Sequence, residues 1–142
     1  MDPANPVVRL CAEGMSAEGR GQAKTALSFF EQAWERSTDD YERCIAAHYV
    51  ARQQPSLIEA LRWNRKALDC AVSSSDQRLD EFYPSLYLNM GKAYEELGNL
   101  GEASTFYHLG AQQMNSLPAG PYGRLISQAI ERGLKRTEPY RE

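Results

Sequence analysis

Small residues recur in this chain at an interval of 34 positions, and this interval constrains the fold more than any other feature. Ala26 and Ala60 are 34 residues apart, and so are Ala33 and Ala67. A repeat of about 20 to 50 residues is typical of proteins that stack one supersecondary unit several times. Each unit is too thin to bury its own apolar face, so it must pack against the next.

Local signals divide each repeat into two helices. Asn5-Pro6 predicts an N-cap followed by proline in the first turn. Gly21, Pro55 and Gly98 stand at equivalent turns, where glycine closes a helix and proline stops one. No segment shows sustained alternation of apolar and polar residues, so we expect no sheet. The predicted helices span residues 6–19, 23–37, 40–53, 57–73, 77–97, 100–115 and 121–135.

Three further helix starts carry the pattern of a capping box. In this pattern a short polar side chain caps the helix, and a glutamate follows three positions later. The pattern occurs at Asp39-x-x-Glu42, Ser56-x-x-Glu59 and Asn99-x-x-Glu102.

A period of 34 residues with two helices per unit is the spacing of the tetratricopeptide repeat (TPR), and the chain resembles that family. The second unit departs from the family pattern, with His48 at a small position and Asn64 at an aromatic one. The resemblance implies an all-α fold, an α-solenoid of antiparallel helix pairs in a single domain over residues 1–142. The repeats fall at about 7–40, 41–74 and 84–117. The third unit matches the family pattern best, at Tyr87, Gly91, Tyr94, Gly98, Ala103 and Tyr107.

Two segments lie outside the regular repeat. Ala60 and Ala103 are 43 positions apart, so residues 75–83 are an insertion, which we interpret as an extension of the fifth helix bent at Pro84. Residues 121–135 predict a capping helix, and we expect the polar tail 137–142 to fray. The capping helix carries an apolar stripe of Tyr122, Leu125, Ile126, Ala129 and Ile130.

The TPR resemblance implies that the first helix of each pair lines a concave groove for a protein or peptide. Asn89 has both donors and an acceptor, so it could pair with an extended peptide backbone. Lys92 and Glu95 beside it could hold the ends of a ligand. The expected groove residues are Met15, Ile45, Tyr49, Arg52, Leu88, Asn89, Lys92 and Glu95.

The best-known TPR specificity, a clamp for the C-terminal carboxylate of chaperone peptides, is not expected here. The resemblance places the lysines, arginine and asparagines of that clamp at five positions, and no cation occupies any of them. These positions hold Cys11, Met15, Ala46, Ser85 and Asn89.

His48 and Asn64 form the most unusual local feature. One interpretation is a partly buried histidine that is hydrogen-bonded to Asn64 across the repeat. The other is a ligand contact or a polar switch, because histidine titrates near neutral pH.

Composition and motifs argue against other function classes. The net charge is −3 and no basic stripe follows the groove, which disfavours nucleic-acid binding. Only two histidines are present, and no catalytic or nucleotide-binding motif appears, so we expect neither an enzyme nor a metal or cofactor. The start of the chain lacks the pattern of a secretory signal, and no run of residues is long and apolar enough for a membrane span, so a cytoplasmic location is expected.

Two alternatives to an adaptor remain open at this stage. A structural protein that associates with itself would use an uncovered apolar edge to form a homodimer. An RNA-binding helical repeat would read bases along the stack.

Overall fold

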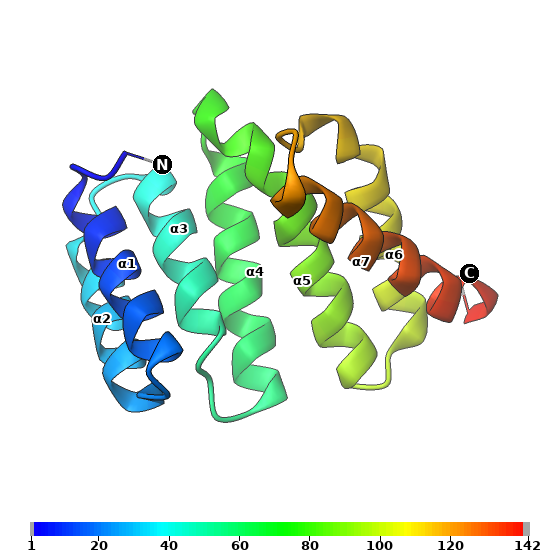
Figure 1. Cartoon of the computed structure of the whole chain (residues 1–142). Helices are drawn as coiled ribbons and strands as arrows, with labels where there is room; N and C mark the ends of the chain where they lie inside the picture. Colours follow the sequence, from blue (N-terminus) through cyan, green and yellow to red (C-terminus); the bar gives the residue numbers. More distant parts are fainter. Residues whose placement is uncertain (1, 141–142) are drawn as a thin grey trace. The chain divides into compact units, whose positions relative to one another are not determined.

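Capping residues start most of the helices in the computed structural model, which describes residues 2–140 of the chain (Figure 1). The Oδ1 atom of Asn5 accepts hydrogen bonds from the amides of Val7 and Val8, at 2.8 and 3.2 Å. The N-caps of the three capping-box patterns are also confirmed, because the side chains of Asp39, Ser56 and Asn99 each accept from the amide three residues later. The helix starts therefore follow from local sequence.

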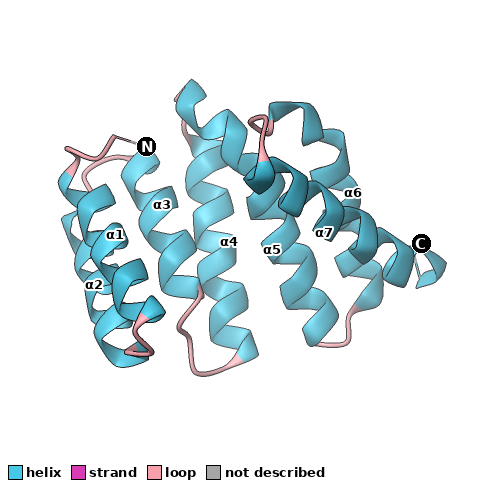
Figure 2. Ribbon diagram, in the orientation of Figure 1, coloured by secondary structure: helices cyan, strands magenta, loops and turns pink. Residues whose placement is uncertain are grey.

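The described chain is all-α, with seven α-helices and no strand among residues 2–140 (Figure 2). The helices pack in sequence-adjacent pairs, a solenoid-like arrangement. The chain divides into two compact units, Met1–Ser75 and Asp76–Glu142. The division coincides with the insertion that interrupts the 34-residue period, and the single domain over residues 1–142 stays a prediction. No helix in residues 2–140 has the length and apolar character needed to cross a membrane.

Unit 1 contains two helix pairs. α1 (Pro6–Gly19) packs on α2 (Ala23–Arg36), and α3 (Asp40–Ala51) packs on α4 (Leu57–Ser73). α3 also contacts α1 and α2, so the second pair stacks on the first.

The connection between α1 and α2 turns at Gly21, whose φ of 73° lies in the left-handed region that favours glycine. Gly98 has a φ of 84° and occupies the same place between the two helices of the pair in unit 2. Both turns match the sequence prediction.

Unit 2 contains one helix pair and a final helix. α5 (Tyr83–Glu96) packs on α6 (Leu100–Gln112), and α7 (Pro121–Thr137) contacts both. Short 3₁₀ segments precede, connect and follow them: η1 (Gln77–Phe82), η2 (Met114–Ser116) and η3 (Glu138–Tyr140).

Two predictions about unit 2 are wrong in detail. The predicted extension of the fifth helix is helical, but it is the 3₁₀ segment η1, which ends at Phe82, and Pro84 lies in the first turn of α5 and not at a bend inside one α-helix. A proline is accommodated there, since the first-turn amides lack intrahelical partners anyway. The tail is also more ordered than expected up to residue 140. Thr137 is fully buried and its hydroxyl donates to the carbonyl of Gly133 at 2.7 Å, whereas residues 141–142 lie outside the described part.

An aromatic ring on the second helix fills the space beside a glycine on the first helix in both units. A Cβ atom on Gly14 of α1 would overlap the ring of Phe30 of α2. A Cβ atom on Gly91 of α5 would lie 2.7 Å from the ring of Tyr107 of α6. The absence of a side chain therefore lets each helix pair approach closely.

Candidate functional site

Three of the expected groove residues lie on α1 and α3 of unit 1, and their side chains differ in exposure. Met15 on α1 is 37% exposed, whereas Ile45 and Tyr49 on α3 are 3% and 9% exposed. The Tyr49 ring stacks on Phe30, with ring centroids 5.3 Å apart. Ile45 and Tyr49 therefore belong largely to the core, and Met15 is the apolar group available to a ligand.

Arg52 adds to this set a charge that is already paired. Its guanidinium lies 3.0 Å from a carboxylate oxygen of Glu18 on α1 and 5.6 Å from the centre of the Tyr49 ring. The side-chain amide of Gln53 donates to the same carboxylate at 2.6 Å. We call Met15, Glu18 and Arg52 the α1–α3 face.

His48 lies on α3 beside this face and is half-buried. Its ring meets the Tyr49 ring edge-on, with centroids 5.1 Å apart. Burial, together with the nearby positive charge of Arg52, lowers the pKa of His48 to about 4. His48 is therefore neutral near pH 7, which argues against a switch that works by protonation in that range. Asn64 is half-buried on α4, and its pairing with His48 stays a prediction.

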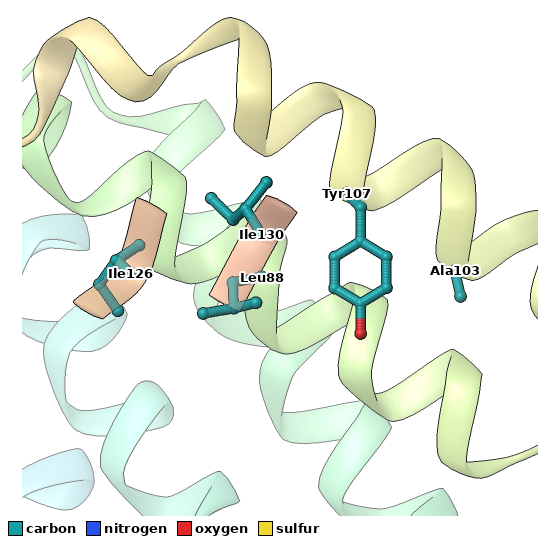
Figure 3. Packing of buried hydrophobic residues seen from close by; sticks show 5 residues of the cluster. All are labelled: Leu88, Ala103, Tyr107, Ile126 and Ile130. Atoms are coloured by element: carbon teal, nitrogen blue, oxygen red, sulfur yellow. The ribbon is translucent and has the colours of Figure 1, made fainter. Parts of the chain in front are cut away.

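Leu88 of unit 2 lies in the core and not on an open surface. It is 6% exposed and packs in one cluster with Tyr107 of α6 and with Ile126 and Ile130 of α7 (Figure 3). The reason is tertiary, because α7 covers the part of α5 that the sequence assigned to a groove floor. Asn89, next in sequence, is half-buried, and Lys92 one turn later is exposed.

Glu95 is held by an intramolecular network. The guanidinium of Arg136 on α7 forms a fork to its two oxygens, at 2.7 and 3.1 Å. The hydroxyl of Tyr107 donates to the carboxylate at 2.7 Å. The hydrogen bonds from Arg136 are the main cause that lowers the pKa of Glu95. Burial, followed by the Glu95 carboxylate, raises the pKa of Tyr107.

A small open hollow lies over this network. It has a volume of about 270 Å³ and is lined by Lys92, Glu95, Glu96 and Arg136. Two cations and two carboxylates line it, so it offers ionic contacts to a bound segment and no enclosed pocket for a small molecule. Within the described residues, no group of three or more histidine, cysteine or acidic side chains could hold a metal ion.

The sequence identified Glu95, Arg52 and Glu18 as groove residues but did not predict that Arg52 pairs with Glu18 or that Glu95 pairs with Arg136. A signal was nevertheless present, because a glutamate follows the contact glycine by four positions in both units, at Glu18 and Glu95. The partner Arg136 has no such signal, since α7 does not follow the 34-residue interval.

The comparisons with known proteins provide no family assignment. No protein-family model matches this chain, and no curated protein matches it.

Proposed function

We propose that this chain is a TPR adaptor that binds another protein or a peptide through the exposed side chains of its first helices and has no active site of its own. The observation that supports it most is the packing of a second-helix ring on a first-helix glycine, at Gly14–Phe30 and again at Gly91–Tyr107. This contact falls at the small and aromatic positions of the TPR pattern in both units.

The chemistry of these residues suits recognition of a chain segment. Met15 offers apolar contact, Arg52 offers the exposed part of a guanidinium that Glu18 holds in place, and Lys92 offers a cation at the edge of a hollow. Such mixed surfaces bind peptides by side-chain contacts along a helix face. The two buried cysteines, Cys11 and Cys44, are free thiols, which fits a reducing compartment, and the proposal therefore places the protein in the cytoplasm.

The test is affinity capture with matched variants. The tagged protein is used as bait in lysate of the cells that make it, and captured proteins are quantified by mass spectrometry. We expect a defined set of partners with the parent protein, and we expect Met15→Ala combined with Arg52→Ala to deplete that set.

The control replaces two exposed residues of α2, a second helix, by Lys24→Ala combined with Arg36→Ala. This control should leave capture intact. Equal capture by both double variants, or no enrichment over an empty tag, would contradict the proposal.

A further inference from the structure

One line of side chains along α7 lies at the surface, except that Ala129 in its middle is half-buried and packs against the core. Tyr122, Leu125, Ala129, Arg132 and Arg136 follow one another at intervals of three and four positions, which places them on one side of the helix. We call these five residues the α7 stripe. Ile126 and Ile130, on the adjacent side, are in the core. Tyr122 and Leu125 are nevertheless 50% and 62% exposed, although the sequence assigned both to the buried side.

Both ends of the α7 stripe are fixed to α5. The hydroxyl groups of Tyr122 and Ser85 are hydrogen-bonded at 2.6 Å, and Ser85 is buried. At the other end, Arg136 forms its fork to Glu95. The stripe is therefore held in a defined orientation before any ligand arrives, which lowers the entropic cost of binding.

The cations of the stripe lie at one end, where Arg136 is paired with Glu95 and Arg132 is not paired. Arg132 and the neighbouring Lys135 are exposed, and neither has an acidic partner within ion-pairing distance among residues 2–140. Lys92 of α5 is likewise without such a partner in that range. Tyr122 and Leu125 occupy the opposite end. At about 1.5 Å per residue, Arg132 lies roughly 10 Å along the helix from Leu125.

This arrangement selects against a second copy of the chain. If two α7 stripes lay antiparallel in full register, the apolar end of one would face the cations of the other. If they lay parallel, Arg132 would face Arg132. Both alignments leave charges unpaired or opposed, which costs free energy.

We propose that the α7 stripe docks an acidic amphipathic helix of a partner protein. The partner helix presents apolar side chains to Tyr122 and Leu125. About two turns further along, its carboxylates contact Arg132 and the cations beside it. This mode is the laying of a helix into a complementary surface. The inference rests on the proposed adaptor function and names the chemistry of one of its partners.

A synthetic peptide provides the test. The probe is a fluorescent helix-forming peptide of about 18 residues with two leucines one turn apart and glutamates about two turns further on. We expect the full chain to bind it with a dissociation constant on the order of tens of micromolar at low salt, as measured by fluorescence anisotropy. A peptide with lysines in place of the glutamates should bind at least about tenfold more weakly.

Two charge reversals on α7 distinguish recognition of the peptide by the stripe from attraction by the overall charge of the protein. Arg132→Glu should weaken binding of the acidic peptide by at least about tenfold and improve binding of the lysine peptide. Arg124→Glu changes the net charge equally but is exposed on another side of α7, so its effect should stay within about twofold. Circular dichroism checks that both variants are folded.

Three results would overturn the inference. One is absence of binding, and another is an equal loss of binding in both variants. The third is a dimer in sedimentation that Leu125→Glu dissociates and the peptide does not. If capture that depends on Met15 and Arg52 persists while the peptide fails, the adaptor function stands and only this inference is wrong. If that capture fails as well, both proposals are wrong.

Discussion

Units 1 and 2 both pack an aromatic ring of the second helix against a glycine of the first helix. The two units differ in the third helix, α3 or α7, that covers the other side of the ring. In unit 1 the ring of Phe30 lies between Gly14 and the ring of Tyr49 on α3. In unit 2 the ring of Tyr107 lies between Gly91 and Gly133 on α7, where an added Cβ atom would approach the ring to 2.5 Å. The first helix therefore requires glycine in both units, whereas the third helix can fill the space with a ring or with its own backbone.

The ion pairs of the two units lie at equivalent positions. Arg52 stands three residues after Tyr49, and Arg136 stands three residues after Gly133. Each arginine binds the glutamate that follows the contact glycine by four positions. Only unit 2 adds a buried hydroxyl to the pair, because its ring is a tyrosine. We therefore expect the arginine–glutamate link to contribute more to stability in unit 2 than in unit 1.

The largest effect is expected when the shared glycine contact is broken. Gly14→Ala places a Cβ atom inside the Phe30 ring, and we expect a loss of about 3 kcal/mol in the free energy of unfolding. Gly19→Ala, in the same helix with open space around it, should be neutral or stabilising by up to about 1 kcal/mol. Urea titration followed by circular dichroism measures both. Equal stability of the two variants would mean that the close approach of α1 and α2 is wrong.

Acid should affect the two units in different pH ranges. The pKa of His48 is about 4 in the folded protein and its ordinary value is 6.5, so the unfolded chain binds more protons between these values. Unit 1 should lose stability, on the order of 2 kcal/mol, as the pH falls from about 6.5 to about 4. The pKa of Glu95 is lowered from 4.5, so its contribution to unit 2 is present above pH 4.5 and is lost only below it.

Hydrogen exchange resolved by unit, measured at pH 7, 5.5 and 4.5, distinguishes the two ranges. His48→Gln should reduce the dependence of the stability of unit 1 on pH and leave that of unit 2 unchanged. An unchanged pH profile in that variant would exclude His48 as the cause.

A smaller effect is expected from removal of the hydroxyl that distinguishes the units. Tyr107→Phe removes the hydrogen bond to Glu95 and keeps the ring, so we expect a loss of about 1 kcal/mol. A double-mutant cycle with Glu95→Gln should give a coupling energy of similar size. Additive effects of the two substitutions would show that the hydroxyl and the carboxylate act independently.

The smallest effect is expected in unit 1. Arg52→Ala breaks the pair with Glu18, but the arginine side chain is 48% exposed, so the loss should be below about 1 kcal/mol. Arg136→Ala should cost more, because it also disturbs the link to Tyr107. Thermal unfolding of both variants makes the comparison, and the reverse order would contradict the assignment of the stronger network to unit 2.

The helices could be predicted from sequence because their starts depend on a few neighbouring residues. Asn5 and Ser56 each cap a helix by a contact within three positions. Pro84 was misplaced because the same residue is compatible with a bend inside a helix or with its first turn. Only the preceding 3₁₀ segment, whose Leu79 is buried, decides between them.

The candidate site was less predictable because exposure depends on what packs from elsewhere. Leu88 has the spacing of a groove residue, but contacts from Ile126 and Ile130 bury it. Leu125 has the spacing of a core residue, but it remains at the surface. Helical periodicity gives the side of a helix to within about one residue, and both errors lie at the edge of a stripe.

The position of the Tyr107 ring between two glycines makes it a natural reporter of motion. The backbones of Gly91 and Gly133 approach the ring so closely that an added Cβ atom on either would lie 2.7 or 2.5 Å from it, which leaves little room for a half-turn of the ring about its long axis. The ring can therefore rotate only when α5 and α7 separate briefly, and such collective motions are far slower than the rotation of an exposed ring. The exchange rate between its two ring edges in a nuclear magnetic resonance spectrum would measure how often that separation occurs.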